Sequence, residues 1–324
     1  MTREFRPIDA GMLKFYAALS AESPPEAVNW PLAEQRRSWD DVCAKFRAPR
    51  PAGLIVEDIQ VPRGDGGEVL VRLYRPRGHK LLPAVIYLHG GGWVLGSLET
   101  HDDVCAELAD QAQVCVIAVD YRLAPEHPHP AQLEDNLEVL NWMRDEGMNY
   151  GFDPARIVAA GDSAGGQMSA CLALWLRDHE GPQLDGLVLI YPVLGSSTET
   201  ASYLTNADAP CLTRGDMIYY LDAVLGPHGS TGWSDPYAMP LHATHFHDLP
   251  PTFISAAAHD PLFDDALTYQ TRLMEAGVEV KLRIEPELTH SYMRARHVSA
   301  PAGAGFAAIV EAVRCLSYTQ RLPQ

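Results

Sequence analysis

The sequence predicts an α/β fold with a mostly parallel sheet and helices on both faces. Between residues 84 and 284, short continuous apolar runs alternate with stretches of helical character. Strands that are apolar on both faces and alternate with helices are typical of a buried parallel sheet. The chain has 324 residues, of which 47% are hydrophobic and 21% charged, and this composition excludes a disordered, collagen-like or coiled-coil architecture.

Residues 1–50 are expected to form two helices that cannot make a core alone. Each helix carries one apolar stripe at helical spacing. The stripes consist of Met12, Leu13, Phe15, Tyr16 and Leu19, and of Trp39, Val42, Cys43 and Phe46. Prolines at positions 24, 25 and 31 break the segment between the two helices. Both helices must therefore pack on the rest of the chain.

From residue 54 onward the pattern becomes that of strands. Residues 54–61 and 69–74 alternate in polarity around a glycine-rich turn, which predicts an antiparallel hairpin at one edge of the sheet. The apolar runs are 84–88, 114–119, 156–160, 187–191, 252–256 and 278–284, and helices are expected at 99–112, 132–146, 164–178, 262–276 and 302–318. Asp153-Pro154 is expected to form a turn or to start a helix, because proline suits the first helical position.

Residues 195–245 interrupt this alternation. They are rich in glycine and proline around one expected helix near 214–225, which is typical of an insertion between two strands. Together with residues 1–50, this insertion is expected to form a helical cap over a main domain of residues 51–324.

Composition limits the partners of the chain. It has 25 basic and 42 acidic residues, and the net charge of −17 disfavours binding to nucleic acid or to an anionic membrane. The N-terminal residues lack the apolar core of a signal peptide, and no uninterrupted apolar run approaches the ~18 residues of a membrane-spanning helix. The six cysteines include no C-x-x-C pair, which indicates a reducing compartment. We therefore expect a soluble, cytoplasmic protein that uses neither nucleic acid nor membrane as a partner.

The sequence Gly161-Asp162-Ser163-Ala164-Gly165-Gly166 connects one apolar run to a predicted helix. A serine between strand and helix lies in a tight turn with its Oγ projecting outward, and small neighbours let the turn close. The N–H of Ala164 would then face a developing oxyanion at a helix N-terminus, where the dipole favours negative charge. A glycine-rich helix start with Ser163 as its N-cap is the alternative.

A second glycine-rich segment, His89-Gly90-Gly91-Gly92-Trp93, follows the apolar run at 84–88. Three glycines expose backbone N–H groups with no Cβ in the way, which suits a second and a third oxyanion donor. A flexible loop or a dinucleotide phosphate loop is the alternative. The spacing is not G-x-G-x-x-G, and Asp120, the nearest candidate for a ribose partner, is followed directly by Tyr121-Arg122.

Asp260 and His290 follow two late predicted strands, in the order after Ser163 that this architecture requires of an orienting acid and a base. The carboxyl ends of parallel strands meet at one edge of the sheet, so we expect Ser163, Asp260 and His290 to converge there.

Other residues compete for these roles. Asp264 and Asp265 lie where a helix begins and suit helix caps or dipole partners. His259 should point away from its neighbour Asp260, and no strand ends before His297. His242, His245 and His247, beside Asp248, superficially resemble a metal cluster, but their proline-flanked loop has no evident scaffold. A place in the cap or at the pocket rim is favoured for them, and we expect no metal.

Taken together, these motifs resemble the α/β-hydrolases of the hormone-sensitive lipase type, the microbial carboxylesterases. The resemblance covers residue 54 to the C-terminus and includes the segments at 89–93, 120–126 and 161–166, Asp260-Pro261-Leu262 and His290. It implies an α/β-hydrolase fold whose catalytic domain spans 51–324, with a cap built from residues 1–50 and an insertion at about 195–245. It also implies oxyanion donors at Gly91, Gly92 and Ala164, supporting positions at His89, Gly90 and Asp162, and a possible homodimer.

The chain departs from this family at His259 and at Ser291-Tyr292, next to two of the expected catalytic residues. These departures leave the shape of the pocket rim, and hence the substrate, open. Arg122 and Glu126 are expected to pair within the scaffold of a rigid loop. Large apolar residues of the cap segments are candidates for lining the pocket, although helix packing is their more ordinary role. These candidates are Phe15, Tyr16, Trp39, Met217 and Tyr220.

The sequence therefore predicts a serine carboxylesterase acting on small-molecule, short-chain esters through an acyl-enzyme. Ser163 would be the nucleophile, His290 the general base and Asp260 the residue that orients His290, with no metal or organic cofactor. A lactone or aryl-ester hydrolase would use the same residues. A non-catalytic small-molecule receptor is disfavoured, because such proteins usually lack one member of the triad.

Overall fold

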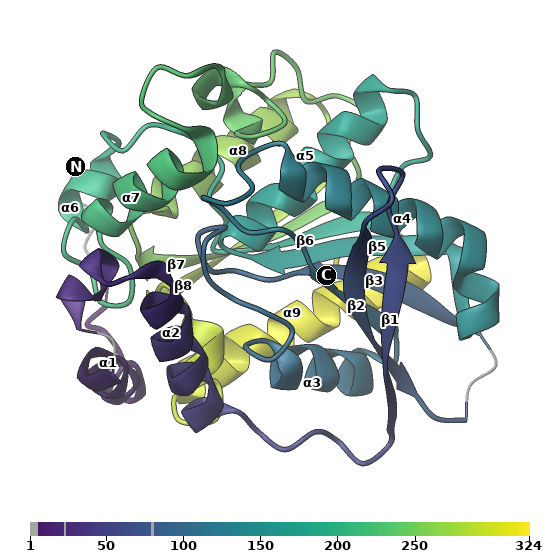
Figure 1. The fold of residues 1–324 in the computed structure, drawn as a ribbon, viewed down its shortest axis with the longest axis horizontal. Coiled ribbons are helices and arrows are strands. Elements are labelled where there is room, and N and C mark those ends of the chain that lie inside the picture. Colours follow the sequence, from purple (N-terminus) through teal and green to yellow (C-terminus); the bar gives the residue numbers. More distant parts are fainter. Residues whose placement is uncertain (1–5, 23, 79–80) are drawn as a thin grey trace.

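The computed structural model describes residues 6–22, 24–78 and 81–324 (Figure 1). Its centre is an eight-stranded sheet in the order β1-β2-β4-β3-β5-β6-β7-β8. The strands are β1 (Leu54–Pro62), β2 (Glu68–Pro76), β3 (Leu82–Leu88), β4 (Cys115–Asp120), β5 (Phe152–Asp162), β6 (Gly186–Ile190), β7 (Thr252–His259) and β8 (Val280–Thr289). β2 is antiparallel to both β1 and β4, and the remaining pairs are parallel. The predicted fold class and edge hairpin are thus confirmed.

Helices cover both faces of this sheet. They are α1 (Ala10–Glu22), α2 (Leu32–Phe46), α3 (Asp102–Ala112), α4 (Ala131–Tyr150), α5 (Ala164–Asp178), α6 (Ala201–Thr205), α7 (Arg214–Leu225), α8 (Phe263–Glu275) and α9 (Ala300–Thr319). Figure 1 shows α3 and α9 on one face, and α4, α5 and α8 on the other. In β3, Val85 and Tyr87 join the core with α3 and α9, whereas Ala84, Ile86 and Leu88 join the opposite core. Burial on both faces explains why the parallel strands are continuously apolar.

The prediction of a turn or helix start at Asp153-Pro154 is wrong, because both residues lie inside β5. The preceding helix α4 ends at Tyr150 and is followed by Gly151 in the left-handed conformation. The pairing of β5 with β3 changes register between Leu82 and Ala84. Such an irregular position tolerates a proline, because no regular ladder hydrogen bond is lost there.

The segment between β6 and β7 contains α6, α7 and two short 3-10 turns. Figure 1 shows α6 and α7 on the same side of the molecule as the N-terminal helices α1 and α2. Helix α2 and the residues after it are joined to the rest of the chain by three ion pairs. These pairs are Arg36–Glu126, Arg47–Glu99 and Arg50–Asp102.

Helix α9 is the one helix in the described ranges that is long and apolar enough to cross a membrane, and half of it is buried in the protein. The sequence pattern does not predict this, because Glu311 and Arg314 interrupt the apolar run. Phe306, Ile309 and Leu316 of α9 belong to the core beneath the sheet. The apolar face of α9 is therefore accounted for by packing within the fold, as in the core helices of many globular proteins.

Candidate active site

Ser163 lies in the turn between β5 and α5. Its backbone has φ 56° and ψ −119°, a conformation that costs free energy for a residue with a Cβ. The turn is close to the end of β3: a Cβ added to Gly165 would lie 1.8 Å from the carbonyl oxygen of Leu88. Glycine at 165 is therefore what lets α5 begin directly after the serine, as the sequence motif predicts.

The structure brings Ser163, His290 and Asp260 together. Ser163 Oγ lies 3.0 Å from His290 Nε2, and His290 Nδ1 lies 2.7 Å from Asp260 Oδ2. Asp260 follows β7 and His290 follows β8, so each stands at the carboxyl end of its strand. The other oxygen of Asp260 accepts a hydrogen bond from the N–H of Leu262 at 2.9 Å. This is the geometry of a serine nucleophile with a base and an orienting carboxylate.

The competing acids and histidines have other partners. Asp264 and Asp265 lie in the first turn of α8, but Asp265 Oδ2 accepts hydrogen bonds from the N–H groups of Leu194 and Gly195 rather than capping that helix. His259 Nε2 is 2.7 Å from the carbonyl oxygen of Arg6, and His297 Nε2 is 2.8 Å from Glu107. Both histidines therefore point away from Ser163.

The glycines after β3 lie beside the serine. Gly91 and Gly92 have φ values of 134° and 59°, and both line the pocket that contains Ser163 and His290. Among the described residues, neither glycine uses its N–H in a hydrogen bond. Ala164 is the first residue of α5, so its N–H has no acceptor one turn earlier in the helix. These three N–H groups are thus available to a bound oxyanion.

The residues expected to support the motif form a buried network. Asp162 accepts hydrogen bonds from Tyr87 Oη at 2.8 Å and from the N–H of Gly90 at 3.1 Å, and lies 3.2 Å from His101 Nε2. Burial opposes its ionisation, but His101, the charge of Arg294 and the hydrogen bond from Tyr87 hold the pKa of Asp162 well below its usual range. Asp162 therefore ties the loop after β3 to the residue before Ser163.

His89 has a structural environment. Its ring stacks on Tyr121, with centroids 4.2 Å apart, and Tyr121 Oη donates to the carbonyl oxygen of His89 at 2.7 Å. Burial, assisted by the nearby His101, lowers the pKa of His89 to about 3, so its imidazole is neutral. The uncharged ring packs beneath the glycine loop.

The pocket at Ser163 has a volume of about 60 Å³ and adjoins a second cavity of about 160 Å³. Both are lined by residues from the N-terminal helices and from the insertion. The residues shared by the two cavities are Trp39, Leu95, Cys211, Leu212 and Tyr220. Of the expected pocket residues, Trp39, Met217 and Tyr220 line the inner pocket and Tyr16 lines the outer one. Phe15 does not, because it packs on Phe46 in the core.

The three clustered histidines lie elsewhere. His242 Nε2 is 2.7 Å from Ser196 Oγ, and His247 Nδ1 is 2.7 Å from Asp248. Within the described ranges, none of the three, His245 included, lines the pocket of Ser163, which leaves the cap as the other of their two expected places. No described group of three or more His, Cys, Asp or Glu side chains is arranged to hold a metal ion.

The expected pairing within the 120–126 loop takes a different form. Arg122 pairs with Asp135, and Glu126 pairs with Arg36 of helix α2. Both side chains therefore serve the scaffold, but with separate partners.

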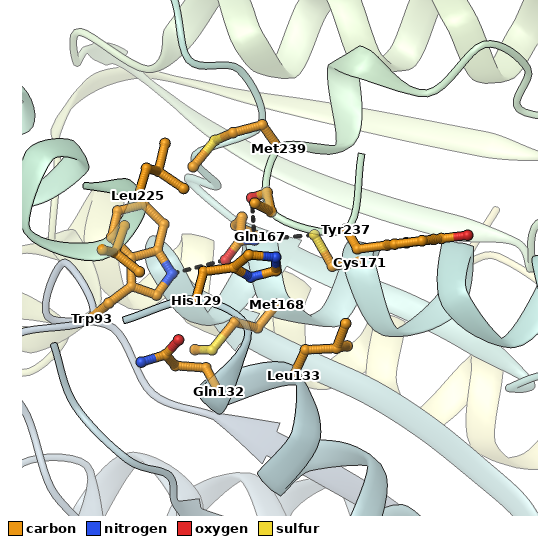
Figure 2. A pocket seen from close by; sticks show the side chains of 12 residues that line it. Trp93, His129, Gln132, Leu133, Gln167, Met168, Cys171, Leu225, Tyr237 and Met239 are labelled. Atoms are coloured by element: carbon orange, nitrogen blue, oxygen red, sulfur yellow. Dashed lines mark hydrogen bonds between the residues drawn. The ribbon is translucent and has the colours of Figure 1, made fainter. Parts of the chain in front are cut away.

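Another cavity lies behind the glycine loop. Figure 2 shows Trp93, the residue after Gly92, with its indole directed toward Gln167 of α5. Trp93 Nε1 donates to Gln167 Oε1 at 2.8 Å. The cavity has a volume of about 10 Å³, which is close to the minimum for one water molecule. It is too small for an organic substrate, so it is not a rival to the pocket at Ser163.

Sequence reasoning missed two residues of the site, His101 and Arg294. Arg294 lies four positions after His290 and lines the pocket of Ser163, and Arg294 Nη2 is 3.0 Å from His101 Nε2. Proximity to the expected base is the one signal that points to Arg294. Nothing local marks His101 as part of the site, because Asp162 and Arg294, its partners besides the neighbouring Thr100, come from distant parts of the chain.

Comparison with known proteins identifies the family of the fold. The family model of the α/β-hydrolase fold matches residues 85–294. Carboxylesterase NlhH of Mycobacterium tuberculosis is 42% identical over 76% of this chain and 79% of that protein. Ethyl acetate hydrolase of Pseudomonas putida is 33% identical over 87% of this chain and 89% of that protein.

Solved structures give the same result. A hyperthermophilic esterase from the archaeon Pyrobaculum calidifontis superimposes with a TM-score of 0.87 at 31% identity, covering 96% of this chain and 99% of that one. The chain therefore belongs to the α/β-hydrolase family and, within it, to the carboxylic ester hydrolases that these relatives represent.

Proposed function

We propose that the protein is a serine carboxylesterase that hydrolyses short-chain esters through an acyl-enzyme. The observation that carries this proposal is the contact chain from Ser163 Oγ through His290 to Asp260, at 3.0 and 2.7 Å, beside the glycine loop. The similarity to an ethyl acetate hydrolase supports a small acyl group. So does Tyr220, whose ring lies 2.4 Å from the position that a Cβ on Gly92 would take.

In the first half of the reaction, Ser163 Oγ attacks the ester carbonyl while His290 Nε2 takes the hydroxyl proton. The carbonyl oxygen becomes an oxyanion that accepts hydrogen bonds from the N–H groups of Gly91, Gly92 and Ala164. Removing one such donor typically raises the barrier by about 3 kcal/mol. The intermediate then collapses: the ester C–O bond breaks, and His290 returns the proton to the leaving alcohol.

In the second half, water attacks the acyl group held on Ser163. His290 takes a proton from this water and returns it to Ser163 Oγ as the free acid leaves. Asp260 accepts a hydrogen bond from Nδ1–H of His290, which keeps Nε2 free to act as base and stabilises the imidazolium that forms.

The test is hydrolysis of p-nitrophenyl esters from acetate to palmitate by the wild type and by Ser163→Ala. We expect wild-type activity to be confined to short chains and to be lost in the variant, because the acyl-enzyme cannot form. Ser196→Ala, which changes a serine outside the pocket, is the matched control and should keep its activity. Equal activity in the wild type and in Ser163→Ala would contradict the assignment of Ser163 as the nucleophile.

We also place the protein in a reducing compartment, the cytoplasm. All six cysteines are free thiols, and Cys43, Cys105, Cys115 and Cys171 are buried. Thiol titration of the protein purified without reductant should give six thiols after unfolding. Fewer than six would point instead to disulfide formation in an oxidising compartment.

A further inference from the structure

Arg294 is a buried cation in the catalytic pocket. It lies in the turn after β8 and is 8% exposed, and it lines the same pocket as Ser163, His290 and the glycine loop. The indole of Trp39 covers its guanidinium, whose carbon lies 5.0 Å from the ring centroid. Because arginine is always protonated in proteins, the pocket carries a fixed positive charge.

Two further arginines are buried in the part of the chain that the structure describes, and both have carboxylate partners. Arg72 pairs with Asp58, Glu99 and Asp102, and Arg296 pairs with Asp103 and Glu107. For Arg294, no carboxylate among the described residues lies within the 4.0 Å limit of an ion pair. A buried charge without a counter-ion in direct contact is expensive. Arg294 thus differs from the arginines that serve the fold.

The hydrogen bonds of Arg294 leave part of its donor capacity unused. Nη1 donates to the carbonyl oxygen of Thr100 at 2.6 Å, and Nη2 lies 3.0 Å from His101 Nε2. A guanidinium has five N–H donors, so up to three are available to a molecule in the pocket. Asp162 and Asp103 favour the charged form of Arg294 through space, without an ion-pair contact, and Asp162 is already held by His101, Tyr87 and the N–H of Gly90.

We propose that Arg294 determines specificity by binding a carboxylate, and that the substrate is a short ester that carries one. This assignment rests on the ester hydrolysis proposed above. A planar guanidinium matches a carboxylate, and the match is stronger where water is excluded. Because Ser163 and Arg294 line one pocket of about 60 Å³, only a few atoms separate the carboxylate from the ester carbonyl.

Two pairs of esters test this proposal. Monomethyl succinate carries the carboxylate on the acyl side, and 3-acetoxypropionate carries it on the alcohol side. Their neutral partners are methyl succinamate and 3-acetoxypropionamide, which replace the carboxylate by an amide of similar size. We expect the wild type to favour the anionic member of at least one pair by 10-fold or more in kcat/KM. The pair that shows this preference identifies whether Arg294 binds a carboxylate on the acyl side or on the alcohol side of the ester.

The variants are Arg294→Gln, Arg294→Lys and, as a control for total charge, Arg314→Gln on the exposed face of α9. Arg294→Gln should remove the preference for the anionic ester, and Arg294→Lys should retain part of it. Arg314→Gln should keep the wild-type ratio. A purely structural role for Arg294 would lower kcat/KM for both members of a pair equally and leave their ratio unchanged, which would overturn the proposal.

Ligand binding separates this proposal from the hydrolysis itself and does not depend on a folded variant. Succinate should inhibit p-nitrophenyl acetate hydrolysis by the wild type at least 10-fold more strongly than succinamide does. If no ester is hydrolysed at all, the esterase proposal fails, and the rise in Tm caused by succinate relative to succinamide then tests Arg294 alone. Equal effects of the two compounds would contradict a carboxylate-binding role.

Discussion

Two aspartates five positions apart have different tasks. Asp260 faces His290, whereas Asp265 is buried and accepts hydrogen bonds from the N–H groups of Leu194 and Gly195 at the start of the insertion. Residue type alone does not separate them. What separates them is whether the side chain leaves the end of β7 or the first turn of α8.

Replacing Asp260 by Asn should lower kcat on the order of 10³- to 10⁴-fold, because an amide no longer holds His290 in the tautomer that leaves Nε2 free. Substrate affinity should change little. The matched control is Asp264→Asn, which alters a nearby carboxylate that binds the N–H of Ser202 instead. A larger loss in the control than in Asp260→Asn would move the orienting role to Asp264.

Asp265 should make stability depend on pH. Burial raises its pKa from an ordinary value of 3.8 to about 7, against the opposing effect of the two backbone hydrogen bonds. The folded state therefore binds the proton more tightly than the unfolded state. This contribution to stability is complete below pH 4 and is lost as the pH rises to 7.

Urea unfolding of the wild type and of Asp265→Asn between pH 4 and 8 measures this contribution. The free energy of unfolding of the wild type should fall relative to that of the variant up to pH 7 and then stay level. A difference that is independent of pH would show that Asp265 ionises normally in the folded protein.

The contact between α5 and β3 depends on the absence of a side chain at Gly165. Gly165→Ala would place its Cβ 1.8 Å from the carbonyl oxygen of Leu88, where backbone must move. Overpacking at the upper end of its usual range costs about 3 kcal/mol, and alanine favours helix by about 1 kcal/mol over glycine, so we expect a net destabilisation of about 2 kcal/mol. Activity should also fall, because Ser163 is displaced.

Thermal unfolding checks this expectation, with Gly53→Ala as control. The nearest atom to a Cβ at position 53 is 3.9 Å away, so that variant should unfold at the wild-type temperature. Equal Tm values for the two variants would mean that α5 can shift without cost.

Helix α7 of the insertion sets the size of the inner pocket through Tyr220. Its ring lies over Gly92, and it lines both the inner and the outer cavity. Tyr220→Ala should join the two spaces, and the preferred acyl chain should lengthen from acetate or butyrate toward octanoate. Tyr219→Ala is the control, since Tyr219 does not line the inner pocket. An unchanged chain-length profile in Tyr220→Ala would place the acyl group elsewhere.

The N-terminal helices contribute to both core and site. Met12 and Phe15 belong to the core that contains α3 and α9, while Trp39 covers the catalytic pocket. Removing residues 1–46 should therefore lower Tm, expose an apolar face that binds a hydrophobic dye, and reduce esterase activity at least 10-fold. A shortened protein with the wild-type Tm and activity would show that these helices are dispensable.

The sequence predicts the position of a strand well where both faces of the strand are buried, and less well at the edge of the sheet. The run at 84–88 marks β3 because both faces of that strand are buried. Edge strand β8 is expected at 278–284 but extends to Thr289, since partial exposure and Pro286 break its apolar pattern. The apolar stripes of α1 and α2 do not reveal that Phe15 enters the core while Trp39 reaches the pocket.

The positions of Ser163, Asp260 and His290 could be predicted because each follows its own strand, so the topology alone brings them together. The surroundings of Arg294 could not be predicted from the sequence. Its hydrogen-bond partner Thr100 is 194 positions away in sequence, and Asp162 meets His101 across 61 positions. No local pattern of residues predicts contacts between segments that are distant in sequence and meet only when two cores form on one sheet.

The wide separation of the site residues has a consequence for folding. Ser163 and His290 are 127 positions apart, and contacts between such distant segments form only after long loops have closed. A partly folded molecule in which β8 has not yet docked beside β7 has its serine turn but no base. The rate at which esterase activity returns during refolding therefore reports the final assembly of the sheet. The rate at which the circular-dichroism signal of the helices returns reports only the start of folding.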